Sequence, residues 1–350
     1  MEVDFLLIGQ GLAGTILSYR LLSAGKKVCI IDNAKANKSS RIAAGLYNPI
    51  TGKKLVKTWN ADKLFPEIKP LYKELENLLG QKFLYPTPIY RPFLSIEEQN
   101  EWMGYSGEEN FEDYIQEIRT KSYYEEVNDP YGGVLLKNSG YVDINTLLDA
   151  FQQKMKSEGI LIDEDFSEEL LEVNAAGVVY KNVRAKAIIY TNGLGAMKSR
   201  YFGYLPFAPV KGEILVLKQS FTPKEIINRG VFRITLPNGN HRVGSTYSWD
   251  DLDQGPTDRA KSEILEKYEK LITIPDKEII EHSTGIRPAT KDRKPFLGKH
   301  PDNENVYVFN GLGAKGVSLA PYLSLQMRDL LIFNEEVEKD VNISRFFKYI

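Results

Sequence analysis

The segment VDFLLIGQGLAGTILSYRLLSAGKKVCIID, residues 3–32, limits what this chain can fold into more than any other. It opens with a continuous apolar run, as expected for a strand that is covered on both faces. A helical apolar pattern follows, and a second apolar run ends at Asp32. Between the first strand and the helix lies the pattern G-x-G-x-x-G, formed by Gly9, Gly11 and Gly14. This order predicts a βαβ unit with a glycine-rich turn.

Each part of this unit has a physical role in binding a dinucleotide. Gly9 permits the tight turn, Gly11 lets a pyrophosphate approach the helix N-terminus, and Gly14 allows close packing of helix on strand. Asp32 can accept hydrogen bonds from an adenosine ribose. The alternative is a glycine-rich turn with a structural role only. Because strand, helix, second strand and acid are all present, we predict a dinucleotide site, although this unit does not distinguish NAD from FAD.

Composition and charge narrow the class of protein. The 350 residues are enough for two domains, or for one large domain with insertions. The net charge of −2 gives no global basic field for nucleic acid or anionic membranes, while a local basic patch stays open. No apolar run reaches the length of a membrane span and the N-terminus carries no basic signal-peptide region. We therefore expect a cytoplasmic protein with no membrane segment.

Few residues are available for thiol or metal chemistry. The single cysteine, Cys29, lies in the second strand of the βαβ unit, where a buried thiol is expected rather than a nucleophile. The histidines are His241, His282 and His300, and they form no cluster in the sequence. Since C-x-x-C and H-E-x-x-H patterns are also absent from the sequence, we predict no metal site.

The order of elements along the chain predicts the fold class. After the βαβ unit comes a strand-rich middle, with a hairpin around Asn238-Gly239, and then a last strand that leads into a glycine-led helix. We predict an α/β fold, α+β overall, in which a Rossmann-type domain of discontinuous segments carries an inserted, mostly antiparallel β-sheet substrate domain. The expected segments are 1–60, 136–205 and 283–350 for the dinucleotide domain, and 61–135 and 206–282 for the substrate domain.

Prolines lead to two local expectations. The helix in FPEIKPLYKELENLLG should have its start marked by Pro66 and Pro70. The segment KFLYPTPIYRPF, residues 82–93, should form edge-like strands, because proline cannot donate to a central ladder.

Three further stretches of small residues could approach a ligand through their backbone. SSRIAAG, residues 39–45, is either a simple loop or a second contact with a cofactor. Asn192 and Gly193 follow a strand, at the edge where α/β sheets collect ligands. GLGAKG, residues 311–316, precedes an apolar helix and lacks side chains at three positions where a ligand could come close.

Four blocks of the chain resemble the FAD-dependent D-amino acid oxidase superfamily, which includes glycine oxidase, sarcosine oxidase and the oxidase half of the bifunctional enzyme that modifies the tRNA wobble uridine. The blocks are IGQGLAGTILSYRLLSAGKKVCIID; SSRIAAGLYNP; GYVDINTLLDAF with AIIYTNGLGA; and GIRPATKDRKPFLGKHPDNENVYVFNGLGAKGVSLAP. They span nearly the whole chain, although residues 61–135 match no block. GLGAKGVSLAP is most similar to the tRNA-modifying oxidase, whose methyltransferase half has no counterpart here.

The resemblance implies that non-covalent FAD is the cofactor. The first glycine loop would hold its ADP half, and residues 311–316 would lie against the isoalloxazine ring. Backbone N–H groups and the positive end of the following helix would stabilise negative charge at flavin N1 and the C2 oxygen. The residues expected to contact FAD are Gly9, Gly11, Leu12, Ala13, Gly14, Asp32, Ser40, Ala44, Gly45, Phe166, Asn192, Gly193, Gly311, Gly313, Ala314, Lys315 and Gly316.

Three side chains are expected at the reaction centre. Arg287, in GIRPAT, matches an arginine that binds the substrate carboxylate in the glycine oxidase branch; the alternative is an ion pair at the domain junction, with Asp292. Tyr247, with Trp249, could wall the pocket or fill the core. Lys315 could bring a positive charge to the flavin or be a solvated loop lysine.

The resemblance implies an oxidoreductase that oxidises the C–N bond of a small amine or amino acid to an imine by hydride transfer to flavin. A second possibility is an oxidase that acts on tRNA, and a third is a non-catalytic flavin-bound subunit of a complex. An NAD-dependent dehydrogenase would leave the C-terminal glycine loop without a role.

Overall fold

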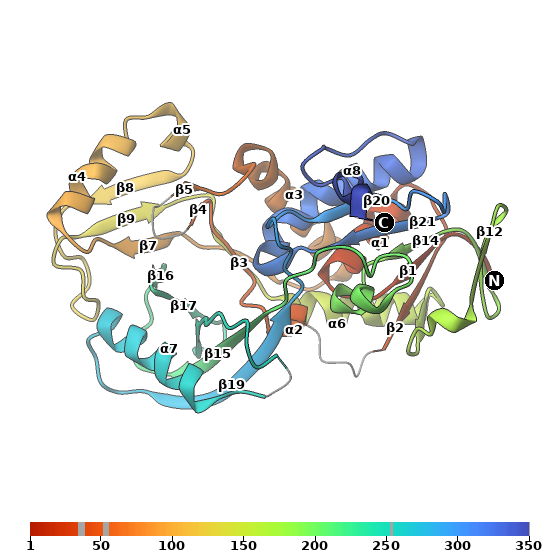
Figure 1. The fold of residues 1–350 in the computed structure, drawn as a ribbon. Helices are drawn as coiled ribbons and strands as arrows, with labels where there is room; N and C mark the ends of the chain where they lie inside the picture. Colours follow the sequence, from red (N-terminus) through yellow and green to blue (C-terminus); the bar gives the residue numbers. More distant parts are fainter. Residues whose placement is uncertain (34–38, 52–55, 253–254, 350) are drawn as a thin grey trace.

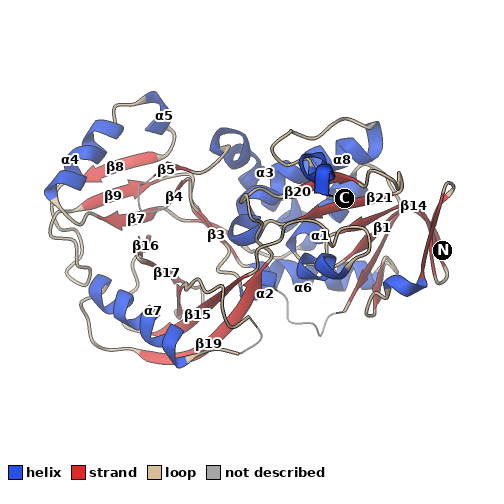
Figure 2. Ribbon diagram, viewed as in Figure 1, coloured by secondary structure: helices blue, strands red, loops and turns tan. Residues whose placement is uncertain are grey.

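Two β-sheets organise the chain into two lobes, which lie at the right and the left of Figure 1. The structure is a computed structural model that describes residues 1–33, 39–51, 56–252 and 255–349. Figure 2 shows that both lobes combine sheet and helix. The predicted mixed α/β fold, with a Rossmann-type unit and a largely antiparallel second sheet, is confirmed.

The first lobe is built on a sheet whose centre is parallel. Residues of its first strands are apolar and buried on both faces, as the continuous apolar runs predicted. The parallel strands are β11 (Leu161–Asp163), β2 (Val28–Asp32), β1 (Glu2–Ile8), β14 (Val183–Tyr190) and β21 (Val306–Asn310). Antiparallel strands extend it: β13 (Gly177–Tyr180), β12 (Leu171–Asn174) and β20 (Phe296–Lys299).

Alternate residues of β1 point into different halves of the core. Phe5 and Leu7 pack with the helices on one face of the sheet, whereas Leu6 and Ile8 pack with residues 193–207 and the C-terminal segment on the other. The helices of the first face are α1 (Leu12–Ser23), α3 (Ala61–Leu79), α6 (Ile144–Ser157) and α8 (Gly316–Phe333). The short 3-10 helices are η1 (Glu168–Leu170), η2 (Gly193–Lys198), η3 (Gly313–Lys315) and η4 (Ile343–Tyr349).

The second lobe contains an eight-stranded sheet that is antiparallel except where β7 meets β16. Its strands, in spatial order, are β19 (Glu278–Arg287), β15 (Val210–Lys218), β18 (His241–Gly244), β17 (Val231–Thr235), β16 (Ile226–Arg229), β7 (Ile89–Pro92), β9 (Gly133–Leu136) and β8 (Ile115–Arg119). The hairpin predicted at Asn238-Gly239 is confirmed, since it joins β17 to β18. The helices of this lobe are α4 (Ile96–Tyr105), α5 (Glu109–Glu112) and α7 (Asp258–Leu271).

Small elements connect the two lobes. They are α2 (Ser39–Ile42), β3 (Leu46–Tyr47), β4 (Ile50–Thr51), β5 (Val56–Lys57), β6 (Leu84–Pro86) and β10 (Gly140–Val142). In Figure 1, α2 lies at the end of the long strands β15 and β19. There Ile42 packs on Gly285, where an added Cβ would lie 3.0 Å from the Ile42 Cβ. This contact fixes how β19 meets the first lobe.

Both expectations drawn from prolines are wrong in part. Helix α3 begins at Ala61 and runs through Pro66 and Pro70, because its apolar stripe packs on α8, where the Tyr72 hydroxyl donates to the carbonyl of Val317 at 3.0 Å. Strand β7 lies inside its sheet rather than at an edge. On the side of β16, only Ile89 and Tyr90 are paired, so Pro92 lies beyond that ladder; on the side of β9, Pro92 pairs with Gly133 at the end of the strand.

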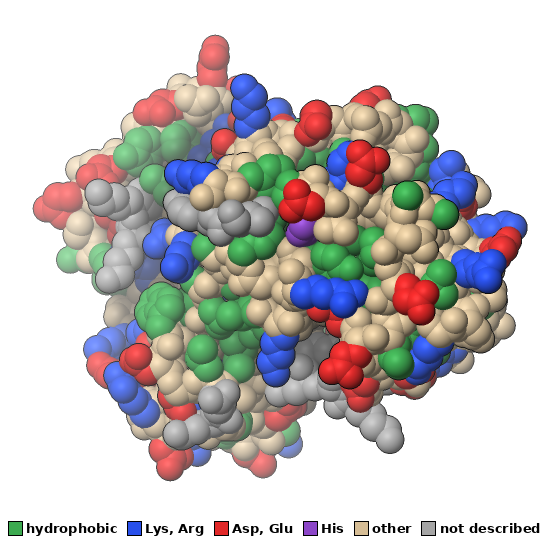
Figure 3. Space-filling view, turned by 45° about the vertical axis from the view of Figure 1, so that its right-hand side comes forward, with side chains coloured by type: hydrophobic (Ala, Val, Ile, Leu, Met, Phe, Trp, Pro, Cys, Tyr) green, Lys and Arg blue, Asp and Glu red, His purple; other side chains and the backbone are tan. Residues whose placement is uncertain are grey.

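Among the described residues, no helix is long and apolar enough to cross a membrane. Figure 3 shows charges of both signs interspersed over one face of the molecule, in keeping with the small net charge.

Candidate active site

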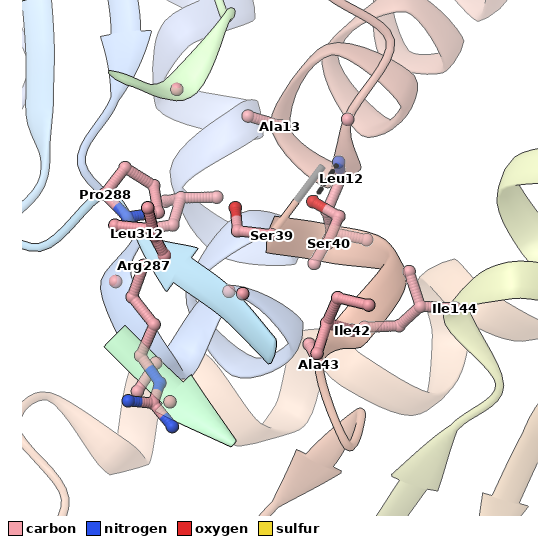
Figure 4. Close-up of a pocket in the computed structure, with 18 of the residues that line it drawn as sticks. Leu12, Ala13, Ser39, Ser40, Ile42, Ala43, Ile144, Arg287, Pro288 and Leu312 are labelled. Carbon is pink, nitrogen blue, oxygen red and sulfur yellow. Dashed lines mark hydrogen bonds between the residues drawn. The ribbon is translucent and has the colours of Figure 1, made fainter. Parts of the chain in front are cut away.

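A cavity of about 1550 Å³ lies between the two lobes. It is lined by the β1–α1 loop, the ends of β2 and β14, α2, strands β15, β18 and β19 of the second sheet, and the β21–α8 loop. Figure 4 shows how α2 brings Ser39, Ser40 and Ile42 between Leu12 on one side and Arg287 on the other. The cavity is therefore bounded by both glycine loops and by the second sheet.

The glycines of the first loop have different tasks. Gly9 has φ +98°, and a Cβ there would lie 2.8 Å from the Asn192 Cα. A Cβ on Gly14 would lie 1.9 Å from the Gly9 carbonyl oxygen, so Gly14 is required by helix packing. At Gly11, by contrast, a Cβ would meet only the Ser40 Oγ, at 3.3 Å, and φ is −78°. A Cβ at Gly11 therefore requires only a small shift of the Ser40 side chain, and Gly11 itself lines the cavity.

This loop fits the ADP half of FAD. Gly11, Leu12 and Ala13 at the start of α1 line the cavity, so the helix N-terminus faces it. Ser40 Oγ accepts from the backbone N–H of Leu12 at 3.2 Å, which holds α2 over the helix start (Figure 4). Asp32 is buried at the end of β2, and its Oδ1 accepts from the backbone N–H of Gln10 at 2.8 Å. A carboxylate held in this way is placed to accept from a ribose.

The second glycine loop meets the end of β14. Asn310 Nδ2 donates to the carbonyl of Gly193 at 2.9 Å, which joins the loops that follow β21 and β14. Gly311 has φ +75°, and a Cβ there would lie 2.7 Å from the Thr290 Cγ2, so this glycine shapes the turn. The loop then passes through η3 into α8 and contributes residues from Leu312 to Ser318 to the cavity wall.

Lys315 borders the cavity and is exposed to it. Its Nζ donates to Thr51 Oγ1 at 3.3 Å. Desolvation, together with the positive charges of Arg293 and Lys294, lowers the pKa of Lys315 from its ordinary value. Its surroundings are therefore electropositive.

Arg287 reaches the cavity from the end of β19 and has no carboxylate partner among the described residues. Its guanidinium donates only to backbone carbonyls and to Ser245, and Cζ lies 4.3 Å from the centre of the Tyr247 ring. Desolvation lowers the pKa of Arg287, and Tyr247 opposes that shift. Arginine remains charged under these conditions. The predicted alternative, an ion pair with Asp292, is wrong, because Asp292 accepts from Arg345 at 2.9 Å.

The two aromatic residues after β18 do not fill the core. Tyr247 is 55 % exposed and lines the cavity, whereas Trp249 is 65 % exposed and lies outside its lining. For Tyr247 the core-filling alternative is therefore wrong.

The cavity brings together residues that are far apart in the sequence. The expected site residues that line it are Gly9, Gly11, Leu12, Ala13, Asp32, Ser40, Ala44, Gly45, Phe166, Asn192, Gly193, Tyr247, Arg287, Gly313, Ala314, Lys315 and Gly316. Gly14 and Gly311 lie behind the lining and shape the two loops. The sequence interpretation missed Gly212, Ser245 and Thr51, which also line the cavity and which no motif marks.

The described residues offer neither a candidate metal site nor an accessible thiol. No group of three or more His, Cys, Asp or Glu that could hold a metal ion occurs among them. Cys29 is fully buried, and burial raises its pKa to about 11. Its place in β2, away from the cavity lining, confirms the expected core thiol.

Comparison with known proteins places this architecture in a family. A family described as FAD dependent oxidoreductase matches residues 4–330. Glycine oxidase from Pseudomonas aeruginosa is 27 % identical over 38 % of this chain and 37 % of its own length. The tRNA 5-methylaminomethyl-2-thiouridine biosynthesis bifunctional protein MnmC from Leptospira interrogans is 24 % identical over 97 % of this chain, which spans 59 % of that protein.

Two solved structures share the fold across almost the full length of both chains. Iminodiacetate oxidase from Chelativorans superimposes with a TM-score of 0.80 at 20 % identity, over 98 % of each chain. Glycine oxidase from Geobacillus kaustophilus also gives 0.80 at 20 % identity, over 99 % of this chain and 98 % of that one. With the family match over most of the chain, these findings show that the protein belongs to the FAD dependent oxidoreductase family, DAO, and is an FAD-dependent oxidoreductase.

Proposed function

We propose that this oxidoreductase acts on the C–N bond of a small amine that carries a carboxylate, and that Arg287 binds the carboxylate. The observation that carries the proposal is the guanidinium of Arg287, which lies in the cavity with no acidic partner among the described residues. A cation left without a counter-ion is matched to an anionic ligand. The similarity to proteins named glycine oxidase and iminodiacetate oxidase supports the same substrate class.

The proposal gives each side of the cavity a task. Bound FAD supplies the hydride acceptor. The first loop and Asp32 would hold its ADP half, and the β21–α8 loop with Lys315 would face its ring with backbone N–H groups and a positive charge. Arg287 and Tyr247, on the second lobe, would orient the acid end of the substrate.

Near Arg287, the described part of the cavity lining holds no histidine or carboxylate that could act as a general base. Among the described residues that line the cavity there is no histidine, and the acidic ones all belong to the first lobe: Asp32, Glu164, Asp165 and Glu168. The substrate amine must therefore arrive in its neutral form or lose its proton to water. The protein contributes orientation and electrostatics rather than proton abstraction.

A panel of substrates tests this function. Reduction of the flavin should be followed without oxygen for glycine, sarcosine and proline, each beside its decarboxylated amine. We expect the acids to reduce the flavin faster than the amines, because only the acids can engage Arg287. Equal rates for acids and amines would contradict the carboxylate anchor. Failure of every compound would contradict the proposal and leave the tRNA oxidase and the non-catalytic flavin subunit, which reduction of the flavin by tRNA separates.

A role in tRNA modification is the second candidate. It is favoured by the match to MnmC over almost the whole chain and by the cationic side chains of Arg293 and Lys294 close to Lys315. In that case the substrate amine would be attached to an RNA loop. Flavin reduction by tRNA whose wobble uridine carries a substituted aminomethyl group, in a preparation that no free amino acid reduces, would support it over the first candidate.

A further inference from the structure

We propose that Gly212 and Ser245 are positioning residues that fix the Arg287 guanidinium and leave one of its edges for the substrate, so that the site accepts a carboxylate in a single orientation. This inference rests on the proposed function of Arg287. It adds two residues that act through Arg287.

Gly212 provides the surface on which the guanidinium lies. In the sheet, Arg287 of β19 pairs with Val210 of the neighbouring strand β15. Gly212 lies two residues after Val210 on β15 and is therefore the diagonal neighbour of Arg287. A Cβ on Gly212 would lie 2.1 Å from Nη2, 2.3 Å from Cζ and 2.4 Å from Nη1 of Arg287. All three distances are far below contact, so any side chain at Gly212 must displace the guanidinium.

Three hydrogen bonds fix the rotation of the guanidinium. Nη1 donates to the carbonyl of Lys211 at 3.3 Å and to that of Thr246 at 3.2 Å. Nη2 donates to the Ser245 Oγ at 2.9 Å. A guanidinium has five N–H groups, so Nε and the second N–H of Nη2 donate to no group in the described part of the chain. These two atoms share one edge, which matches the two oxygens of a carboxylate.

The glycine is thus required by the ligand site rather than by the backbone. Gly212 lies in the middle of β15 and pairs regularly with Gly285, and it is absent from the residues with positive φ. An alanine would suit the strand itself. We therefore expect a substitution at Gly212 to displace the Arg287 guanidinium and to leave the strand intact.

The test uses FAD-loaded protein and benzoate as a carboxylate that is not oxidised, with benzamide as its neutral counterpart. Calorimetric titration should show that Gly212→Ala weakens benzoate binding by about tenfold or more, because the guanidinium has moved. Ser245→Ala should weaken it by roughly two- to tenfold, the effect of one lost hydrogen bond. Benzamide binding and FAD content should not change in either variant. Gly104→Ala, in exposed α4 with nothing within 4 Å of the added Cβ, is the matched control.

A double variant separates positioning from general damage. Arg287→Met should abolish the preference for benzoate, and Gly212→Ala in that background should weaken benzoate binding no further, since both act through one group. Additive effects, or wild-type benzoate affinity in Gly212→Ala and Ser245→Ala, would overturn the inference while leaving the Arg287 anchor intact. If Gly212→Ala does not fold, Ser245→Ala decides. A wild-type protein that binds neither benzoate nor amino acids would instead overturn the proposed function.

Discussion

Gly11→Val is expected to give a folded protein that purifies without FAD. A Cβ at Gly11 meets only the Ser40 Oγ, at 3.3 Å, and the backbone angle is ordinary, so the protein can adopt its fold with a side chain there. The two methyl groups of valine would enter the cavity at the N-terminus of α1, where the pyrophosphate of FAD is expected. We expect a loss of affinity on the order of a hundredfold or more, which is about 3 kcal/mol.

The measurement is the FAD released on denaturation per mole of protein, together with thermal unfolding of the protein without cofactor. Gly11→Ala is the graded control and should weaken FAD binding less, because it adds one methyl group. Gly14→Ala should behave differently and destabilise the fold itself, since its Cβ would lie 1.9 Å from the Gly9 carbonyl oxygen. Full FAD content in a folded Gly11→Val protein would show that the loop is structural only.

The parts of the fold that the sequence predicts well are those fixed by local signals. In the βαβ unit, turn glycines, helix periodicity and buried strands all lie within residues 2–32, and the structure has them as β1, α1 and β2. The hairpin at Asn238-Gly239 is local in the same sense. In such segments the local sequence preferences agree with the final fold, so the sequence alone predicts them.

Tertiary contacts decide the segments where prediction fails. Proline in a helix interior removes a hydrogen bond and disfavours continuation, yet α3 continues through Pro66 and Pro70. The apolar stripe of Leu64, Ile68 and Leu71 is fully buried, and this burial outweighs the cost. That burial depends on α8, more than two hundred residues later in the chain, and no local pattern announces it.

The same reason limits what the sequence says about the site. Arg287 is marked by its motif, but the groups that orient it are not. Gly212 lies on another strand, and Ser245 follows β18, so only the register of β15 with β19 and β18 brings them to the guanidinium. The sequence around Gly212, KGEILVLK, therefore does not indicate that this glycine lies against the guanidinium.

Removal of the Arg287 side chain should have the largest effect on catalysis. Arg287→Ala is expected to lower kcat/KM for carboxylated amines by more than about a hundredfold, on the order of 3 kcal/mol in transition-state binding, because the charge pair would be desolvated. Arg287→Lys keeps the charge but loses the planar pair of donors, so its loss should be smaller but clear. The measurement is steady-state kinetics with glycine, sarcosine and proline, compared with their decarboxylated amines.

The decisive comparison is between the rates of the acids and those of their decarboxylated amines. If Arg287 acts on the carboxylate alone, the variant should lose its preference for acids over amines while the slow reaction of the amines stays as in the wild type. Arg259→Ala, which removes an exposed arginine on α7, controls for the change in net charge. A variant slowed equally on acids and amines would show that Arg287 supports the structure of the cavity instead. A variant as fast as wild type on the acids would remove the carboxylate anchor altogether.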